Sequence, residues 1–253
     1  MATFEDVKRK IEINKEVSFG DVLDNCFTLF KKIWLKGFVV IIIIMAIAFL
    51  MNLLFTAIGL GTDSNVFLLD GDFDFYSVYS TQILYGFPQT IIMSTITIGL
   101  LAGFYKICKE EDVNNNQIDH FFHYFKSECF SKLFMLGIIY SAIALVAQLM
   151  FMIPYIYAYV PLAYFSIVFS NNPDLSEMEI VKLSFNIGTK KWLVSFGLLF
   201  VCAIIGMLGI IGCGIGLLFT ISIAYLPVYF IYKEVVGFDD LTEIDQIGTS
   251  QMD

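Results

Sequence analysis

The residues best suited to metal chemistry lie near the middle of the chain, where His120 and His123 are accompanied by Asp119 and Glu128. Imidazole and carboxylate groups on one face of a helix are typical ligands of zinc and other transition metals. A stable site needs a third and a fourth ligand on the same face, and the sequence around the histidines is short of them. We therefore interpret the histidines as polar side chains at the level of lipid headgroups, and we predict no metal and no cofactor.

Neutral polar residues form a second group with chemical potential, because they lie inside long apolar stretches. The group consists of Gln89, Thr90, Ser94, Thr95 and Thr97 in one stretch, and Ser141 and Gln148 in the next. Such side chains usually form hydrogen bonds between membrane helices, and the alternative is a polar-lined path between the two stretches. Gln89 and Gln148 are the residues that we single out for that path.

Ionisable residues are missing from all the apolar stretches, which contain no Asp, Glu, Lys, Arg or His. A charge inside a membrane costs about 3 kcal/mol or more and persists where a proton relay, an ion site or a voltage sensor needs it. Their absence counts against transport driven by protons or sodium. Nucleophilic triads, phosphate loops and paired catalytic carboxylates are also lacking, and Asp70–Asp74 lacks the ligand pattern of a calcium loop. We predict a protein that is not an enzyme.

The composition indicates a membrane protein, since 58% of the residues are hydrophobic and only 15% are charged. Six segments are long and apolar enough to cross a bilayer. We predict spans at 38–60, 83–105, 133–153, 155–170, 193–211 and 216–232. Pro154 and the glycine-rich stretch 212–216 are the expected turns inside the two longest apolar runs.

The distribution of charge predicts the orientation of these spans. All 15 Lys and Arg residues can be placed on one side, whereas the loop 61–82 on the other side carries Asp63, Asp70, Asp72 and Asp74. Basic residues favour the cytoplasmic side, so both termini are expected in the cytoplasm of a bacterium, and the protein in its inner membrane. No cleavable signal peptide is expected, and the ends 1–17 and 237–253 are expected to be disordered. With a single arginine, Arg9, the chain is not expected to bind nucleic acid.

Three segments between the spans resemble amphipathic helices on the cytoplasmic face, and we place them at 18–36, from 116, and at 176–192. Ser176 and Glu179 form a capping-box pattern at the start of the third, and lysine and tryptophan end the first and third. The candidate membrane-interface residues on these segments are Phe27, Lys31, Lys32, Trp34, Phe125, Phe185, Lys190, Lys191 and Trp192.

The amphipathic segments also indicate an internal repeat. Val181, Phe185 and Trp192 match Leu23, Phe27 and Trp34 at a constant offset. We predict an all-α domain, 18–236, of six transmembrane helices and three amphipathic helices, built from units 18–107, 116–170 and 176–236. The middle unit matches least well, and the alternative is convergence among helices that enter a membrane.

One more echo concerns the even-numbered spans. Ala158-Tyr-Val-Pro161 in the fourth span and Ala224-Tyr-Leu-Pro227 in the sixth have nearly the same sequence.

Residues 150–236 resemble a bacterial family that includes the YciC-like inner-membrane proteins and the membrane domain of some glycerophosphoryl diester phosphodiesterases. The resemblance rests on Pro154-Tyr-Ile-Tyr157, on 172–184 (NPDLSEMEIVKLS), on Lys191-Trp192 and on Gly214-Ile-Gly216. Ile180 and Tyr155 depart from the family pattern, which often has alanine and glycine there. The resemblance implies a polytopic membrane fold. The phosphodiesterase chemistry belongs to a separate soluble domain, which this sequence lacks, and the beta-carotene oxygenase label of some relatives would need an iron site with more histidines.

From these observations we expect a scaffold or accessory subunit, or a lipid-handling protein, at the inner leaflet. Membrane lipids and a membrane-protein partner are the expected partners, because lysines near an anionic leaflet contribute about 1 kcal/mol each. The alternative is a small-solute transporter or channel that uses the polar residues of the second and third spans. A membrane-embedded enzyme is a third hypothesis, and it would need ligands that the sequence does not offer.

Overall fold

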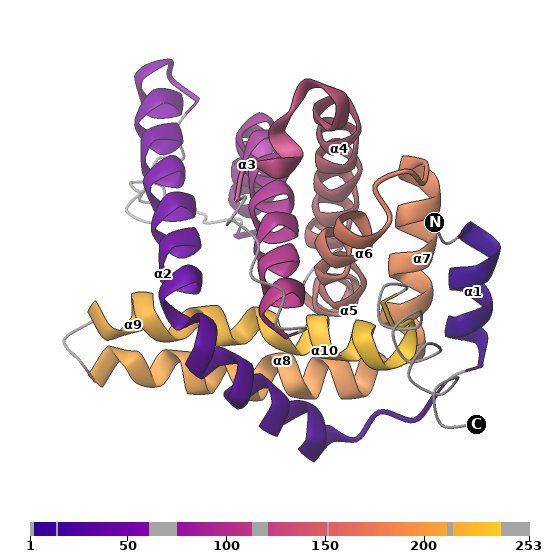
Figure 1. Ribbon diagram of the computed structural model, residues 1–253. Coiled ribbons are helices and arrows are strands. Elements are labelled where there is room, and N and C mark those ends of the chain that lie inside the picture. Colours follow the sequence, from indigo (N-terminus) through magenta and orange to yellow (C-terminus); the bar gives the residue numbers. More distant parts are fainter. Residues whose placement is uncertain are drawn as a thin grey trace, which may run out of the picture.

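The computed structural model describes residues 3–13, 15–60, 75–112, 121–150, 152–211 and 215–238, and it contains no strand within these ranges. The all-α prediction is therefore confirmed (Figure 1). In chain order the elements are α1 (Phe4–Glu12), α2 (Phe19–Ala57), α3 (Phe75–Asp112), η2 (His123–Phe125), α4 (Ser127–Leu149), α5 (Met152–Ala163), α6 (Phe165–Asn171), α7 (Glu177–Lys190), α8 (Trp192–Met207), η3 (Leu208–Ile211), α9 (Ile215–Thr220), η4 (Ile221–Tyr225) and α10 (Leu226–Val235).

Six helical stretches are long and apolar enough to cross a membrane, as the sequence predicted. They are Phe19–Ala57, Tyr79–Asp112, Cys129–Leu149, Ile153–Asn171, Trp192–Ile210 and Gly216–Val235. The fourth combines α5 with α6, and the sixth combines α9, η4 and α10. The chain is thus a polytopic helical protein with the composition of a membrane protein.

Some sequence predictions fall outside the described residues, and the structure says nothing about them. They concern the acidic loop 61–74, the start of the middle amphipathic segment with Asp119 and His120, the turn residues 212–214 and the tail 239–253.

Pro154 does not form the turn between the third and fourth spans. It is the third residue of α5, whose first residue is Met152, and α4 ends before it at Leu149. The first turn of a helix tolerates proline because the backbone N–H groups there have no partner inside the helix. A proline in an apolar run can therefore mark a helix start as well as a turn.

The first amphipathic segment is not a separate surface helix. Residues 19–36 continue without a break into the first span, and together they form α2. At 1.5 Å per residue this helix of 39 residues is about 58 Å long, well beyond the roughly 30 Å of a bilayer core. Its apolar stripe, which includes Val22, Cys26, Leu29 and Ile33, is buried in the protein core.

The third amphipathic segment does form a helix of its own, α7. The predicted capping box is present, since Glu179 Oε2 accepts hydrogen bonds from the backbone N–H of Ser176 (2.8 Å) and from its hydroxyl (2.7 Å). Packing against α5 is close, because a Cβ on Gly188 would lie 2.5 Å from the Cα atom of Pro161. Ile180, Leu183 and Ile187 are buried, so the apolar face of α7 contacts protein.

The middle segment contains only a short 3-10 turn within its described part, η2, instead of the expected amphipathic helix. It lies against the glycine face of α3, where Cβ atoms on Gly99 and Gly103 would collide with Phe125 and with the backbone of Phe121. The Tyr124 hydroxyl donates to the carbonyl oxygen of Ser170 at 2.8 Å, and burial raises the pKa of this tyrosine.

The internal repeat is not established by the arrangement of these segments. α2 and α7 share a burial pattern, because Val22, Cys26 and Leu29 match Ile180, Ser184 and Ile187, all buried, at the offset found in the sequence. η2 has no counterpart of such a helix in the described residues. The repeat therefore stays a prediction.

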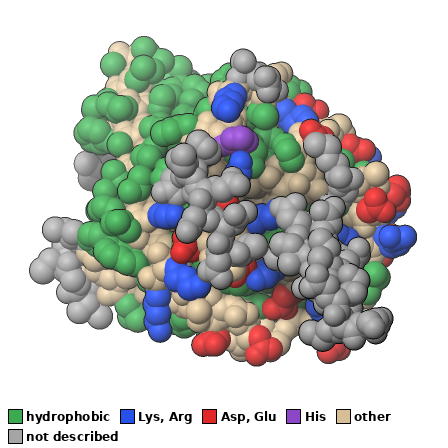
Figure 2. All heavy atoms as spheres, viewed as in Figure 1, with side chains coloured by type: hydrophobic (Ala, Val, Ile, Leu, Met, Phe, Trp, Pro, Cys, Tyr) green, Lys and Arg blue, Asp and Glu red, His purple; other side chains and the backbone are tan. Residues whose placement is uncertain are grey.

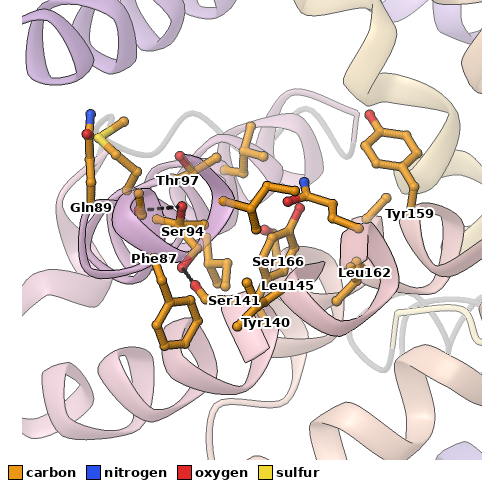
Figure 3. A pocket seen from close by; sticks show the side chains of 18 of the residues that line it. Phe87, Gln89, Ser94, Thr97, Tyr140, Ser141, Leu145, Tyr159, Leu162 and Ser166 are labelled. Carbon is orange, nitrogen blue, oxygen red and sulfur yellow. Dashed lines mark hydrogen bonds between the residues drawn. The ribbon is translucent and has the colours of Figure 1, made fainter. Parts of the chain in front are cut away.

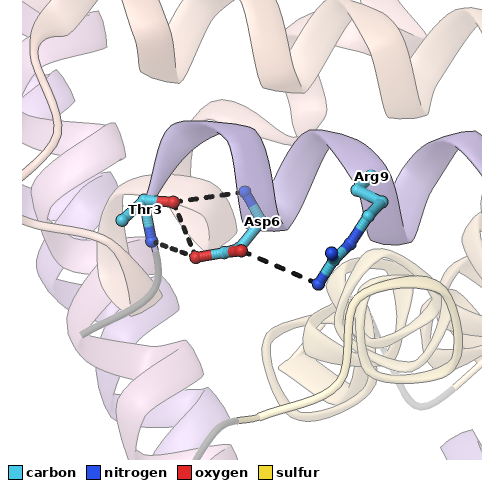
Figure 4. Close-up of polar contacts among 3 residues, drawn as sticks. All are labelled: Thr3, Asp6 and Arg9. Atoms are coloured by element: carbon cyan, nitrogen blue, oxygen red, sulfur yellow. Dashed lines mark hydrogen bonds and ion pairs between the residues drawn. The ribbon is translucent and has the colours of Figure 1, made fainter.

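The N-terminal segment is ordered from Thr3, whereas the sequence suggested a disordered end. α1 is capped by Thr3, whose hydroxyl lies 2.6 Å from Oδ2 of Asp6, and Arg9 lies 3.8 Å from the same carboxylate (Figure 4). The hydrogen bonds from Thr3 hold the pKa of Asp6 below its ordinary value. Val7 and Ile11 are buried, and α1 lies against α7 (Figure 1).

Charged side chains join the ends of several helices at one end of the bundle. Lys36 of α2 lies 3.5 Å from Glu111 of α3, and Lys132 of α4 donates to the carbonyl oxygen of Pro173 at 2.5 Å. Figure 2 shows basic and acidic side chains together on the viewed face, while hydrophobic side chains cover its upper left part. We call this the charged end of the bundle.

α6 lies at the centre of the protein, and its position is fixed from several sides. All residues from Phe165 to Phe169 are buried. Ser170 donates to the carbonyl oxygen of Ala102 in α3 at 2.9 Å, and Asn172 donates to the Tyr232 hydroxyl of α10 at 2.8 Å. The residues of α6 are therefore held at defined heights against α3.

A candidate ligand cavity between the membrane spans

One face of α3 lines a cavity over most of the length of that helix. Its lining residues recur at steps of three and four and include Tyr79, Gln82, Gly86, Thr90, Met93, Thr97, Leu101 and Tyr105. At 1.5 Å per residue this stripe is about 39 Å long, which exceeds the hydrocarbon thickness of a bilayer. The helical periodicity of α3 thus builds one continuous wall.

The other walls come from helices that pack around α3. α4 contributes Tyr140, Ser141, Leu145 and Gln148, while α5 and α6 contribute Tyr159, Leu162, Ala163 and Ser166. Asn52, Leu199, Tyr225 and Val228 complete the lining. The cavity measures about 670 Å³, a size typical of sites for small molecules and cofactors. Figure 3 shows Gln89 near one end of the view and Tyr159 near the other.

The lining is polar but uncharged, since none of its residues is Asp, Glu, Lys, Arg or His. Part of its polar surface is used within the protein. Ser94 and Ser141 have their Oγ atoms 2.8 Å apart, and both lie within hydrogen-bonding distance of the Gly137 carbonyl oxygen (Figure 3). These two serines join α3 to α4, so they are structural.

Four other polar side chains of the lining are unused. Within the described part of the chain, Gln89, Thr97, Gln148 and Ser166 make no side-chain hydrogen bond. Ser166 is the most enclosed of them, with only 4% of its surface exposed. Unpaired hydroxyl and amide groups inside an apolar protein are costly unless water or a ligand completes their hydrogen bonds.

The cavity ends in tyrosines on the side of the charged end. Tyr105, the last α3 residue of the lining, is 1% exposed, and its hydroxyl donates to the Tyr225 carbonyl oxygen at 3.1 Å. Asn52, Thr90 and Tyr159 are exposed and lie on the cavity margin. The cavity is therefore open to its surroundings at its margin and blocked by tyrosines toward the charged end.

The structure brings Gln89 and Gln148, the pair singled out from the sequence, to this one cavity. Sequence reasoning missed Tyr140, Tyr159, Tyr225 and Ser166. The repeated Ala-Tyr-x-Pro pattern of the fourth and sixth spans was a usable signal for two of them, because Tyr159 and Tyr225 occupy the same position in it. Nothing in the sequence distinguishes Ser166 from other serines in the spans.

The candidate membrane-interface residues do not form one uniform surface. Lys31, Lys32, Trp34 and Lys190 are exposed, whereas Phe27, Phe125, Phe185 and Trp192 are half-buried. Phe27 and Phe185 pack against the core, and Phe125 lines a second, apolar pocket of about 460 Å³ between α2, α3 and α4. The Trp192 indole N–H donates to the Tyr157 carbonyl oxygen at 3.1 Å.

Lys191 differs from the expectation for a lipid-facing lysine. Its residue is only 9% exposed, and Nζ donates to the carbonyl oxygen of Lys15 at 2.6 Å. The reason is the turn between α7 and α8, which directs residue 191 toward the segment that follows α1. Lys191 thus connects parts of the protein instead of contacting lipid.

The described residues contain no group of three or more His, Cys, Asp and Glu side chains that could hold a metal ion. His123 is half-buried and packs edge-to-face on Tyr124, with ring centroids 5.0 Å apart.

Comparisons with family models, with curated proteins and with solved structures return no match to this chain.

Proposed function

We propose that this chain is a non-enzymatic, lipid-handling protein of the bacterial inner membrane, and that it binds an uncharged amphipathic molecule in the cavity. The observation that carries the proposal is the set of unpaired neutral side chains, Gln89, Thr97, Gln148 and Ser166, around a cavity of about 670 Å³ inside the spans. Sites of this kind bind molecules whose polar groups are few and precisely placed.

The chemistry of the lining supports an uncharged ligand. A charged ligand would have to leave water for a site without a countercharge, and the desolvation of an isolated ion is very costly. The same absence of ionisable groups disfavours coupling to protons, because a proton relay needs titratable side chains. Movement of the ligand would then follow its own concentration gradient.

The lysines give the proposed orientation. Lys36, Lys132 and Lys233 all lie at the charged end, and basic residues favour the cytoplasmic side of a membrane. Both termini would be cytoplasmic, and the tyrosine-blocked end of the cavity would face the cytoplasm. Reporter fusions at each terminus test this orientation, because a periplasmic phosphatase reporter at either end should be inactive and a cytoplasmic fluorescent reporter active.

The binding proposal is tested by purifying the protein from its own membrane into nanodiscs and identifying the retained small molecules by mass spectrometry. Leu145→Trp fills the cavity, whereas Val146→Trp places the same side chain on the exposed face of α4, where residue 146 is 57% exposed. The expected result is one neutral species retained by the wild type and by Val146→Trp, and lost in Leu145→Trp. Equal retention by both variants would contradict the proposal.

A scaffold or accessory role is a second candidate, which the exposed residues Lys31, Lys32 and Trp34 favour. They lie together on α2, outside the protein core, where a partner or anionic lipid could contact them. Replacing Lys31, Lys32 and Lys190 with glutamine should abolish co-purification of a stoichiometric protein partner, or reduce the preference for anionic lipid in liposomes. Lys191→Gln is unsuited to this experiment, because that side chain is buried.

A further inference from the structure

Contacts between the helices place the cavity residues at defined heights. Ser170 bonds to Ala102, and Ser94 lies beside Ser141. Ser166 is one helical turn before Ser170, so it lies at about the height of Ile98 and next to Thr97 along α3. Both Thr97 and Ser166 line the cavity, and neither makes a side-chain hydrogen bond within the described residues.

Gln148 and Gln89 lie at a different height. Gln148 is two turns beyond Ser141 in α4, which runs antiparallel to α3, so it lies near residue 87 of α3. The two hydroxyls are therefore separated from the two amides by roughly 15 Å along the bundle. Leu145, Leu162 and Ile98 supply much of the surface between the two levels.

We infer that the ligand is an uncharged molecule with a hydroxyl or carbonyl oxygen at one end of an apolar body, and that Ser166 is the residue that determines specificity for this oxygen. This inference rests on the proposed function of the cavity. Ser166 is more than nine-tenths buried, lines the cavity, and has no partner for its hydroxyl within the described residues. Leaving such a hydroxyl unpaired is unfavourable, so a ligand that completes the hydrogen bond is preferred over one of the same shape that cannot.

The position of Ser166 agrees with this role. It lies about one turn from the height of Leu101 and about two turns from Tyr105, whose hydroxyl is already bonded to Tyr225. An oxygen that enters from the open margin would reach Thr97 and Ser166 before the tyrosine closure. The apolar body would then lie against Leu145 and Leu162, with the Gln89 and Gln148 amides toward its other end.

Two probes of equal size test the inference, namely dodecanol and tridecane, in which a methyl group replaces the hydroxyl. Binding of the radiolabelled probes to protein in nanodiscs is measured after subtraction of the signal from Leu145→Trp. The wild type should prefer dodecanol by about tenfold, the difference that one hydrogen bond to a buried group confers. Ser166→Ala should remove this preference by weakening dodecanol binding about tenfold while leaving tridecane binding unchanged.

Ser184→Ala is the matched control, because Ser184 is also buried but its hydroxyl donates to the Ile180 carbonyl oxygen at 2.8 Å, away from the cavity. It should keep the wild-type preference and lower the unfolding temperature. Ser166→Ala removes an unpaired hydroxyl, so it should leave the unfolding temperature unchanged or raised. Thr97→Val gives a second, isosteric variant, in which the preference for dodecanol should decrease.

The outcomes separate this inference from the proposed function. If Leu145→Trp binds both probes as the wild type does, the cavity is not the site and both proposals are wrong. If Leu145→Trp abolishes binding but Ser166→Ala keeps the preference for dodecanol, or if the wild type shows no preference, the assigned role of Ser166 is wrong and the cavity proposal stands.

Discussion

Asp112, the last residue of α3, accepts a hydrogen bond from Lys233 of α10, with Oδ2 and Nζ 2.5 Å apart. The same oxygen accepts a hydrogen bond from the Tyr229 hydroxyl at 2.9 Å. The neighbouring Glu111 lies 3.5 Å from Lys36 of α2. The end of α3 therefore joins two other spans, and it does so two turns from Tyr105, which blocks the cavity.

Removing the charge of Asp112 should destabilise this end of the bundle. In Asp112→Asn the Lys233 ammonium loses its countercharge while its side chain remains only 33% exposed. We expect a loss of about 1–3 kcal/mol in the free energy of unfolding, less than for a fully buried pair because water still reaches Lys233. Unfolding in detergent micelles measures it.

The double variant Asp112→Asn/Lys233→Met should recover part of this loss, since no uncompensated ammonium remains. Lys8→Gln is the control, because Lys8 pairs with Glu5 on an exposed surface at 3.9 Å. Exposed pairs contribute about 0–1 kcal/mol, so this variant should change little. A loss in Lys8→Gln as large as in Asp112→Asn would contradict the special role of Asp112.

Lys191 should hold the N-terminal helix in place. Its Nζ bonds to the carbonyl oxygen of Lys15, which follows α1, and Lys191→Met removes that bond while keeping an apolar stem of similar length. We expect faster hydrogen exchange in α1 and faster proteolysis around Ile13. Lys190→Met changes the exposed neighbour and serves as the control, which should exchange as the wild type does.

The parts of the fold that the sequence predicts well are those that depend on local chemistry. The six spans follow from runs of apolar residues, and the α7 capping box follows from the spacing of Ser176 and Glu179. Both features need only the nearest residues and a solvent, either lipid or water.

Features that depend on distant residues could not be predicted in the same way. The stripe of Val22, Cys26 and Leu29 has the period of a surface helix, yet it is buried by other spans, and the sequence does not tell a lipid from a protein neighbour. Ser166 is important for the cavity because α3 and α4 pack beside it. Gln89 and Gln148 were accessible to sequence reasoning because a side-chain amide is unusual in a span.

Close contact between α3 and α4 should make Gly137 intolerant of a larger residue. A Cβ there would lie 2.0 Å from the Thr95 hydroxyl oxygen and 2.9 Å from the Thr95 Cα atom. We expect Gly137→Ala to cost about 1–3 kcal/mol in unfolding free energy, the range for an overpacked core. Gly20→Ala is the control, since no atom lies within 4 Å of the added Cβ, and it should be neutral or slightly stabilising. Equal unfolding temperatures for both variants would show that α3 and α4 pack less tightly.

The capping box of α7 should make the start of that helix sensitive to acid. Hydrogen bonds from the Ser176 hydroxyl and backbone N–H favour the Glu179 carboxylate, and they lower its pKa from the ordinary value of 4.5. A carboxyl group whose pKa is lower in the folded state stabilises that state above the unfolded pKa, and this contribution disappears as the pH falls through the folded pKa. Hydrogen exchange of the first amides of α7 should therefore be slowest, relative to an unstructured reference, above about pH 4.5, and the protection should decrease below it. Glu179→Gln should flatten this dependence, whereas Glu177→Gln, which removes an acid from the same turn but none of the hydrogen bonds to Ser176, should retain it. An unchanged dependence in Glu179→Gln would assign the acid sensitivity to another group.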